Sequence, residues 1–175
     1  LYAAAINRLA EDGVITGYGD GTFGPDRPVT RQQFAKMILV GLGYDVPPVT
    51  VSTFRDVEAL PDCPDPLYPV AYVQACVNAG ITVGRTADTF CPWDNITRAQ
   101  LITMVARAVG VPAAPPGFVA PFGDFSPQHD AWAVRAYAAG LLDGFVDMGR
   151  DFDFWAPATR GEVCLILAQV LDCGD

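Results

Sequence analysis

The sequence is poor in histidine and in basic side chains. It has a single histidine, His129, and its five cysteines include no Cys-x-x-Cys spacing, which excludes a zinc site of the usual kind. Eleven Lys and Arg residues stand against 20 Asp and Glu, a net charge of −9. That charge repels polyphosphate, so we expect no nucleic-acid partner. No apolar run approaches the roughly 18 residues that span a bilayer, so we expect no membrane insertion.

The cysteines fall into two environments. Cys76 and Cys164 occupy apolar helical positions, where we expect small buried hydrophobic side chains. Cys63 and Cys91 lie in proline-flanked loops, and a disulfide could join them if the fold brings those loops together. Cys173 is left without an assigned partner.

Motifs for catalysis are also missing. The sequence contains no serine elbow, no catalytic Cys–His signature and no metal motif, and its acids are scattered through turns rather than paired as in a glycosidase. The glycine-rich segment 17–21 follows an expected helix rather than a strand and lacks the lysine of a phosphate-binding loop. We therefore expect no enzymatic activity and no cofactor.

One unit recurs three times along the chain. A Thr-Arg pair occurs at residues 30–31, 97–98 and 159–160, at spacings of 67 and 62 residues. A phenylalanine precedes each threonine by seven residues, as Phe23, Phe90 and Phe152. The units are separated by the proline-rich connectors 46–49 and 111–117. We predict three repeats, at residues 1–45, 54–111 and 122–175.

Each repeat has the pattern of a helix, a loop and a second helix. In the first repeat, the second helix begins at Thr30 and places Phe34, Met37 and Ile38 on one apolar face. The threonine is followed three residues later by Gln or Glu in every repeat, which is the spacing of a capping box. A short helix pair cannot bury such a face alone, so we predict an all-α fold in which the three repeats pack around a common centre.

These motifs resemble the S-layer homology family. Residues 17–23 carry the family's Gly-Tyr-x-Asp-Gly-Thr-Phe loop, and 29–31 the start of its second helix. The second repeat keeps that helix start at 96–98, whereas the third keeps it at 159–162 after a divergent loop. The resemblance implies three helix–loop–helix repeats in a pseudo-threefold bundle, or spindle, with ligand grooves between repeats. It also implies secretion to the cell surface and binding of an acidic secondary cell wall polysaccharide, often through a pyruvylated amino sugar.

The resemblance also implies a set of ligand-binding residues. The matching positions are Arg31, Arg98, Arg160, Asp20 and Gly21. An arginine directly after the helix cap is unfavourable at the positive end of the helix dipole, but beside free backbone N–H groups it would form a site for a carboxylate or phosphate. The alternative is a structural ion pair with an aspartate of a neighbouring repeat, such as Asp56 or Asp124. We expect one competent groove and at most two.

Aromatic residues in the loops could cover a sugar ring. We predict this role for Tyr18, Trp93 and Trp155, and a place in the core for Trp132. His129 has no acidic or nucleophilic partner in the sequence, so we expect it at the surface.

Non-covalent anchoring to the cell wall is therefore the expected function. The alternative is a degenerate module for protein–protein assembly, including self-association in a surface layer. The first repeat lacks the aromatic-x-Asp lead-in found at 54–57 and 122–125, so we expect the chain to be part of a longer protein.

Overall fold

The computed structural model describes residues 2–172, which form six α-helices, and Cys173 lies outside this range. The helices are α1 (Ala3–Glu11), α2 (Arg31–Gly41), α3 (Val70–Asn78), α4 (Arg98–Ala108), α5 (Asp130–Ala138) and α6 (Arg160–Asp172). Within these residues, no helix combines the length and the apolar character needed to cross a bilayer. The predicted all-α fold of three helix–loop–helix repeats is confirmed.

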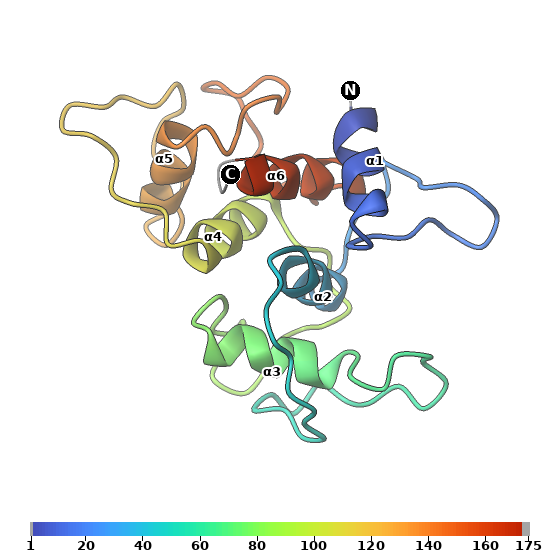
Figure 1. Ribbon diagram of the computed structural model, residues 1–175. Helices are drawn as coiled ribbons and strands as arrows, with labels where there is room; N and C mark the ends of the chain where they lie inside the picture. The colour runs from blue at the N-terminus through green and yellow to red at the C-terminus, as the bar shows by residue number, and fades with distance from the viewer. Residues whose placement is uncertain (1, 173–175) are drawn as a thin grey trace.

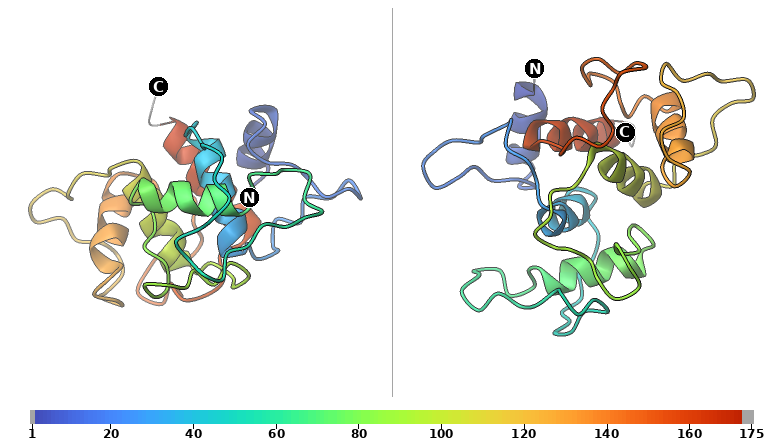
Figure 2. Two further views of the ribbon diagram at one scale, coloured as in Figure 1. Left: turned by 90° about the horizontal axis from the view of Figure 1, so that it is seen from below. Right: turned by 180° about the vertical axis from the view of Figure 1, so that it is seen from behind.

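The main helix pairs join different repeats. Helix α3 packs on α2, α5 packs on α4, and α1 packs on α6, so each pair combines the first helix of one repeat with the second helix of the repeat before it. Figure 1 shows α2, α4 and α6 towards the centre with the other three helices outside them, and the rear view in Figure 2 shows the same arrangement. The pairing of α1 with α6 closes the circle between the first and last repeats.

Three loop segments meet at the centre through a closed ring of backbone hydrogen bonds. The Val29 N–H donates to the Ala158 carbonyl at 3.1 Å, the Ala158 N–H to the Ile96 carbonyl at 2.8 Å, and the Ile96 N–H to the Val29 carbonyl at 2.9 Å. Each of these residues precedes a repeated threonine, and all three are buried. Because the donors and acceptors follow the repeat order, the ring defines a pseudo-threefold axis.

The second helix of each repeat begins as the sequence predicts. A capping box forms in all three repeats, between Thr30 and Gln33, Thr97 and Gln100, and Thr159 and Glu162. The apolar faces that follow lie in the core, with Phe34, Ile38, Leu101, Val105, Val163 and Leu167 fully buried. The helix start and the core stripe therefore repeat together.

The cysteines confirm one prediction and contradict another. Cys76 and Cys164 are buried, and burial raises the pKa of each thiol to about 12. Cys63 and Cys91 are free thiols, so the expected disulfide is wrong. The physical reason is that the two loops are held in different surroundings: Cys63 lines a cavity beside α2, whereas the Cys91 N–H donates to Asp56 of the same repeat at 2.7 Å.

Because the helix pairs join different repeats, we predict that the chain unfolds as one unit. Leu9→Ala in α1 removes a fully buried side chain and should lower the free energy of unfolding by about 2–5 kcal/mol. The three tryptophans all lie in the second and third repeats. Their fluorescence and the far-UV circular dichroism should nevertheless shift to the same lower denaturant midpoint. Separate midpoints for the two signals would contradict this prediction, and Val119→Ala, at an exposed position, should change stability by less than about 0.5 kcal/mol.

Candidate functional site

The arginines of the three Thr-Arg pairs stack on phenylalanines of the next repeat. The distances from guanidinium carbon to ring centroid are 4.5 Å for Arg31 over Phe90, 4.9 Å for Arg98 over Phe152 and 4.2 Å for Arg160 over Phe23. Each phenylalanine is the one that precedes the threonine by seven residues. The ring faces fix the guanidinium planes, and the edges of those planes remain for hydrogen bonds.

The backbone N–H groups at the starts of α2, α4 and α6 are already bonded. At α2, the Arg31 N–H donates to the Asp94 carbonyl at 2.9 Å and the Gln32 N–H to the Pro92 carbonyl at 3.1 Å. Equivalent bonds hold the starts of α4 and α6, each from a loop of the next repeat. The expectation of an anion site on free N–H groups is therefore wrong, because the neighbouring loop satisfies these groups. An anion near these helix starts would therefore have to bind side chains, among them the arginines.

Arg98 is neutralised inside the protein. Its Nε and Nη2 atoms lie 2.8 Å and 2.7 Å from Oε1 of Glu162, and its Nη1 donates to the Asp153 carbonyl at 3.3 Å. Glu162 is the capping glutamate of α6, so one side chain caps the helix and pairs with the arginine. The alternative of a structural ion pair thus holds for Arg98, but with Glu162 instead of Asp56 or Asp124.

Arg31 keeps unused donors although it is only 4% exposed. Its Nε donates to the Phe90 carbonyl at 2.7 Å, and no acceptor from the described residues bonds its two Nη groups. Among the described residues, every fully buried side-chain nitrogen or oxygen has a hydrogen-bond partner. Because the Nη groups have none, they are not fully buried and reach open space. Arg160 is intermediate, because its Nε and Nη2 donate to the carbonyls of Phe23 and Thr16, both at 2.9 Å.

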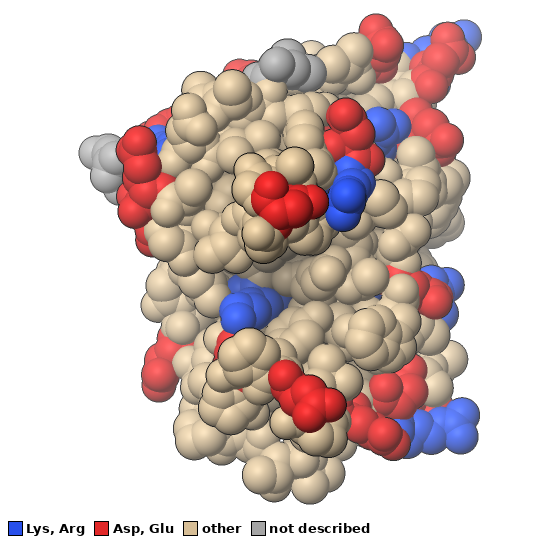
Figure 3. All heavy atoms as spheres, turned by 90° about the vertical axis from the view of Figure 1, so that its right-hand side faces the viewer, with Lys and Arg blue, Asp and Glu red and all other residues tan. Residues whose placement is uncertain are grey.

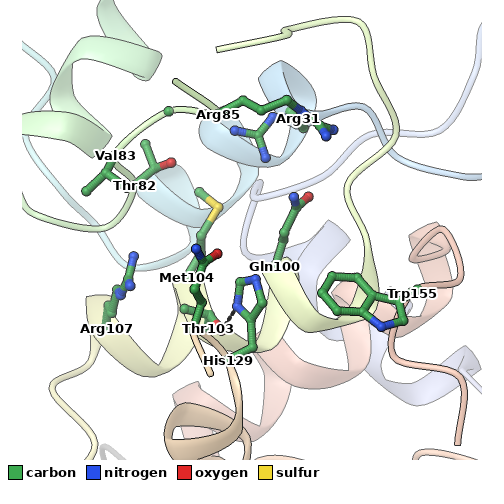
Figure 4. A pocket seen from close by; sticks show the side chains of 12 residues that line it. Arg31, Thr82, Val83, Arg85, Gln100, Thr103, Met104, Arg107, His129 and Trp155 are labelled. Atoms are coloured by element: carbon green, nitrogen blue, oxygen red, sulfur yellow. Dashed lines mark hydrogen bonds between the residues drawn. The ribbon is translucent and has the colours of Figure 1, made fainter. Parts of the chain in front are cut away.

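The open space beside Arg31 is a cavity of about 570 Å³ between the second and third repeats, which we call the large groove. Its floor is a face of α4, formed by Gln100, Thr103, Met104 and Arg107. Its walls are the loop 82–85, residues 128–129 and Trp155. Figure 4 shows these side chains around the cavity, with the Gln100 amide towards Arg31. Sequence analysis places Trp155 at such a groove, and the structure places it there.

The large groove carries positive charge on an acidic protein. Arg31, Arg85 and Arg107 line it, and no carboxylate of residues 2–172 does, although the chain has a net charge of −9. Arg85 pairs with Asp94 at 3.1 Å on the exposed rim. Burial lowers the pKa of Arg31, and the like charge of Arg85 lowers it further. An arginine stays protonated at neutral pH even so, hence the groove favours an anion.

His129 lies in the large groove, so the expectation that it lies on the surface is wrong. Its Nδ1 is 2.7 Å from the Thr103 hydroxyl, and its ring lies 5.9 Å from that of Trp155. Burial lowers the pKa of His129, and the charge of Arg107 lowers it further, whereas Asp130 acts in the opposite direction. The imidazole is therefore neutral at pH 7.

A cavity of about 330 Å³, the small groove, lies at the equivalent place between the first and second repeats. Gln33, Lys36 and Met37 of α2 take the positions of Gln100, Thr103 and Met104, and Arg160 takes that of Arg31. Lys36 pairs with Asp65, which neutralises part of the positive charge. Figure 3 views the molecule from this side and shows a hollow across its middle in which basic atoms lie.

The remaining predicted residues lie outside both grooves. Tyr18 packs against Arg160, with 4.8 Å between the guanidinium carbon and the ring centroid. Asp20 accepts hydrogen bonds from the backbone and hydroxyl of Thr22, and Gly21 takes a positive φ of 81° in the same turn. Trp93 is 66% exposed and lines neither groove.

Sequence analysis missed Arg85, Arg107, Thr103 and His129. A signal for two of them was present, because a shift of 67 residues aligns Arg85 with Tyr18 and Arg107 with Val40. Arginine at positions that are uncharged in the first repeat could have marked the second repeat as different. The approach of His129 to α4 has no local signal, since it depends on how α5 packs.

Comparison with known proteins places the chain in a family. The S-layer homology domain matches residues 2–35 and 65–102. The chain is 37% identical over 103 residues to an endoglucanase of Bacillus sp. (strain KSM-635), and 30% identical over 171 residues to a cell surface protein of Thermoanaerobacter kivui. It is also 30% identical over 144 residues to a cellulosome-anchoring protein of Acetivibrio thermocellus.

These alignments cover 59%, 98% and 80% of this chain, but only 10%, 20% and 30% of the respective relatives. The chain thus spans less than a third of the length of the curated relatives it matches. The domain match falls on the first two repeats, the Thermoanaerobacter alignment extends through nearly the whole chain, and the structure gives the third repeat the same helix–loop–helix form. The chain belongs to the S-layer homology family, whose domains are typical of the cell-wall anchoring of surface-layer and cell-surface proteins.

Proposed function

We propose that this chain anchors a protein to the cell surface by holding an acidic cell wall polysaccharide, without a covalent bond, in the grooves between its repeats. The observation that carries the proposal is Arg31, a buried guanidinium whose Nη groups reach a cavity lined by no carboxylate. Removing a charge from water without supplying a partner costs several kcal/mol. A carboxylate or phosphate of a bound glycan would supply that partner through charge-assisted hydrogen bonds.

Other features of the large groove suit a sugar. Trp155 is half-exposed at the rim, where its ring offers an apolar face beside polar neighbours. Gln100 uses its carbonyl oxygen to cap α4, which leaves its amide hydrogens for a ligand. Thr103 and Gln128 add further polar groups. A groove with one aromatic edge and several hydrogen-bonding groups can bind both the ring and the hydroxyls of a saccharide.

The three interfaces differ in their capacity for an anion. The large groove offers the free Nη groups of Arg31, and the small groove offers the remaining donors of Arg160. At the third interface, Glu162 occupies the position of the two glutamines and binds Arg98. We therefore assign the stronger binding to the large groove, weaker binding to the small groove, and none to the third interface.

The names of the relatives agree with an anchoring role. One is a cell surface protein and another is a cellulosome-anchoring protein. The endoglucanase relative shares only 10% of its length with this chain, so catalysis forms no part of the proposal. Assembly with other proteins is the competing function, and it requires no anion in the grooves.

Arg31→Gln should weaken binding to purified cell walls by about tenfold or more, since a hydrogen bond to a charged group contributes about 1.5–3 kcal/mol. Arg160→Gln should weaken it less, because two of the Arg160 nitrogens already bond to protein carbonyls. The measurement is co-sedimentation with walls of Thermoanaerobacter kivui and Acetivibrio thermocellus, and with the same walls stripped of polysaccharide.

The matched control for this experiment is Arg150→Gln, which removes the same charge from an exposed loop outside both grooves and should bind as the parent chain does. Circular dichroism verifies that each variant is folded. Full wall binding by Arg31→Gln, or equal binding to stripped walls, would contradict the proposal. Oligomers that form with rising concentration and ignore the walls would instead support protein assembly.

His129 supplies an independent test, because it is the chain's one histidine and its ring protons titrate without overlap in an NMR spectrum. Its pKa in the folded protein should lie below the usual 6.5 or so, as burial and Arg107 disfavour the protonated ring. At a pH between the pKa of His129 in the folded protein and that in the unfolded chain, the unfolded chain binds more protons than the folded protein. The free energy of unfolding should therefore fall as the pH drops below about 6.5. His129→Gln should remove this pH dependence.

An anion in the large groove should raise the pKa of His129, since a nearby negative charge favours the imidazolium. Sulfate is a suitable probe because its own charge is constant over this pH range. A pKa at or above that of a free histidine in the sulfate-free protein would contradict the burial argument. An unchanged pKa at saturating sulfate would contradict anion binding in this groove.

A further inference from the structure

The large groove is longer than a single anionic group requires. Gln100, Thr103, Met104 and Arg107 follow one face of α4 at the spacing i, i+3, i+4, i+7. Seven residues of an α-helix rise about 10 Å, so Gln100 and Arg107 lie two turns apart. Figure 4 shows Arg31 and Arg85 above Gln100. It shows Arg107 on the opposite side of Thr103 and Met104 from Gln100. The positive charges therefore lie at two ends of the groove.

Arg107 has no anionic partner among the residues that the structure describes. Across the described residues, its guanidinium takes part in no ion pair and no side-chain hydrogen bond, and it stacks over Trp132 with 5.5 Å between the guanidinium carbon and the ring centroid. The Arg107 side chain is half-buried, and this burial lowers its pKa. The tryptophan holds the guanidinium in place but does not neutralise it.

The middle of the large groove is uncharged at neutral pH. Thr103 and the neutral His129 hydrogen-bond to each other there, beside Met104. A ligand that satisfies both ends would therefore carry its charges apart, with a neutral portion between them. Two charges that are separated by about two helical turns would belong to different sugar units.

The small groove lacks the second cation. The position of Arg107 is taken there by Val40, and the equivalent residue of the third repeat is Gln169. Lys36, the other cation of the small groove, pairs with Asp65. The second positive end is thus a property of the large groove alone, which is also the larger of the two cavities.

We propose that Arg107 forms a second anion subsite, so that the large groove binds a glycan segment with two anionic groups, one at Arg31 beside Gln100 and the other at Arg107, two helical turns of α4 away from Gln100. This inference rests on the proposed function and narrows its ligand to a doubly charged segment. Arg107 then determines which acidic polymers are preferred, because a polymer with a single terminal charge would leave this guanidinium unpaired.

The test uses linear dicarboxylates of increasing length, from succinate to sebacate, with octanoate as the single-charge reference. Each is titrated into the intact chain, and binding is followed by the ring resonances of His129, which lies between the two ends. The affinity should rise with length and then level or fall, and suberate should bind at least about tenfold more tightly than octanoate. Arg107→Gln should abolish the preference for suberate, so that suberate binds the variant within about twofold of octanoate.

Arg135→Gln is the matched control. Arg135 also stacks on Trp132, at 4.8 Å from guanidinium carbon to ring centroid, but it does not line the large groove. Its loss removes the same charge and a similar aromatic contact, and the preference for suberate should persist. Arg107→Lys retains the charge and should keep a measurable part of the preference, which separates charge from packing.

The outcomes distinguish this inference from the function on which it rests. Equal binding of suberate and octanoate, or an unchanged preference in Arg107→Gln, would overturn the second subsite. The proposed function would survive the failure of the second subsite, provided that Arg31→Gln loses binding to cell walls. If Arg31→Gln altered neither wall binding nor the binding of either probe, the proposed function would fail, and the inference with it.

Discussion

The closed ring of backbone hydrogen bonds among Val29, Ile96 and Ala158 is the constraint on which the rest of the structure depends. Each segment in the ring continues directly into a threonine cap and a central helix, so the ring fixes where α2, α4 and α6 begin. The same geometry brings a loop carbonyl of the next repeat to each of the first two N–H groups of those helices. The helix ends are thereby satisfied by protein, and the arginine side chain at each helix start extends over the neighbouring phenylalanine. The backbone hydrogen bonds of the ring and of the helix starts thus place the guanidinium groups.

At each of the three interfaces, the side chain that caps the central helix decides whether the arginine is free to bind a ligand. Gln33 and Gln100 cap their helices with an amide, which is neutral, whereas Glu162 caps with a carboxylate whose second oxygen binds Arg98. The ion pair at the third interface satisfies a nearly buried carboxylate, and removing either partner would leave an uncompensated charge. With glutamine at the other two interfaces, Arg31 and Arg160 form no ion pair within residues 2–172. Stacking and backbone hydrogen bonds hold these two arginines in place instead. Their residual electrostatic cost is what a bound anion would relieve, as expected where a site conflicts with stability.

The parts of this structure that sequence analysis could predict are those with local causes. The capping boxes and the apolar faces of Phe34 and its equivalents depend on spacing within one helix. The same spacing occurs in all three repeats, which strengthened the prediction. The pairing of α1 with α6 could not be predicted in this way, because it joins the two ends of the chain. The same holds for the loop carbonyls at the helix starts, which made the expectation of free N–H groups wrong. Arg31 was identified through its motif, but its difference from Arg98 depends on Glu162, 64 residues further along the chain from Arg98. His129 entered the site through the packing of α5, which no short motif encodes.

Under the proposed function, a chain with a net charge of −9 would hold an anionic polymer, because repulsion by the surface acids and attraction by the groove arginines act over different distances. Charges on the surface are screened over roughly 8 Å at physiological ionic strength, so the scattered acids contribute little inside a partly desolvated groove. The Arg31 guanidinium acts through direct hydrogen bonds at close range, where a low local dielectric strengthens them. The acidic exterior would therefore disfavour loose, non-specific adhesion to a polyanion while leaving the groove itself competent. Under the proposed function, the large and small grooves would also act together on one polymer. Once the first groove is occupied, the second meets a ligand at high effective concentration, so two modest sites on a rigid frame can retain a protein at the wall.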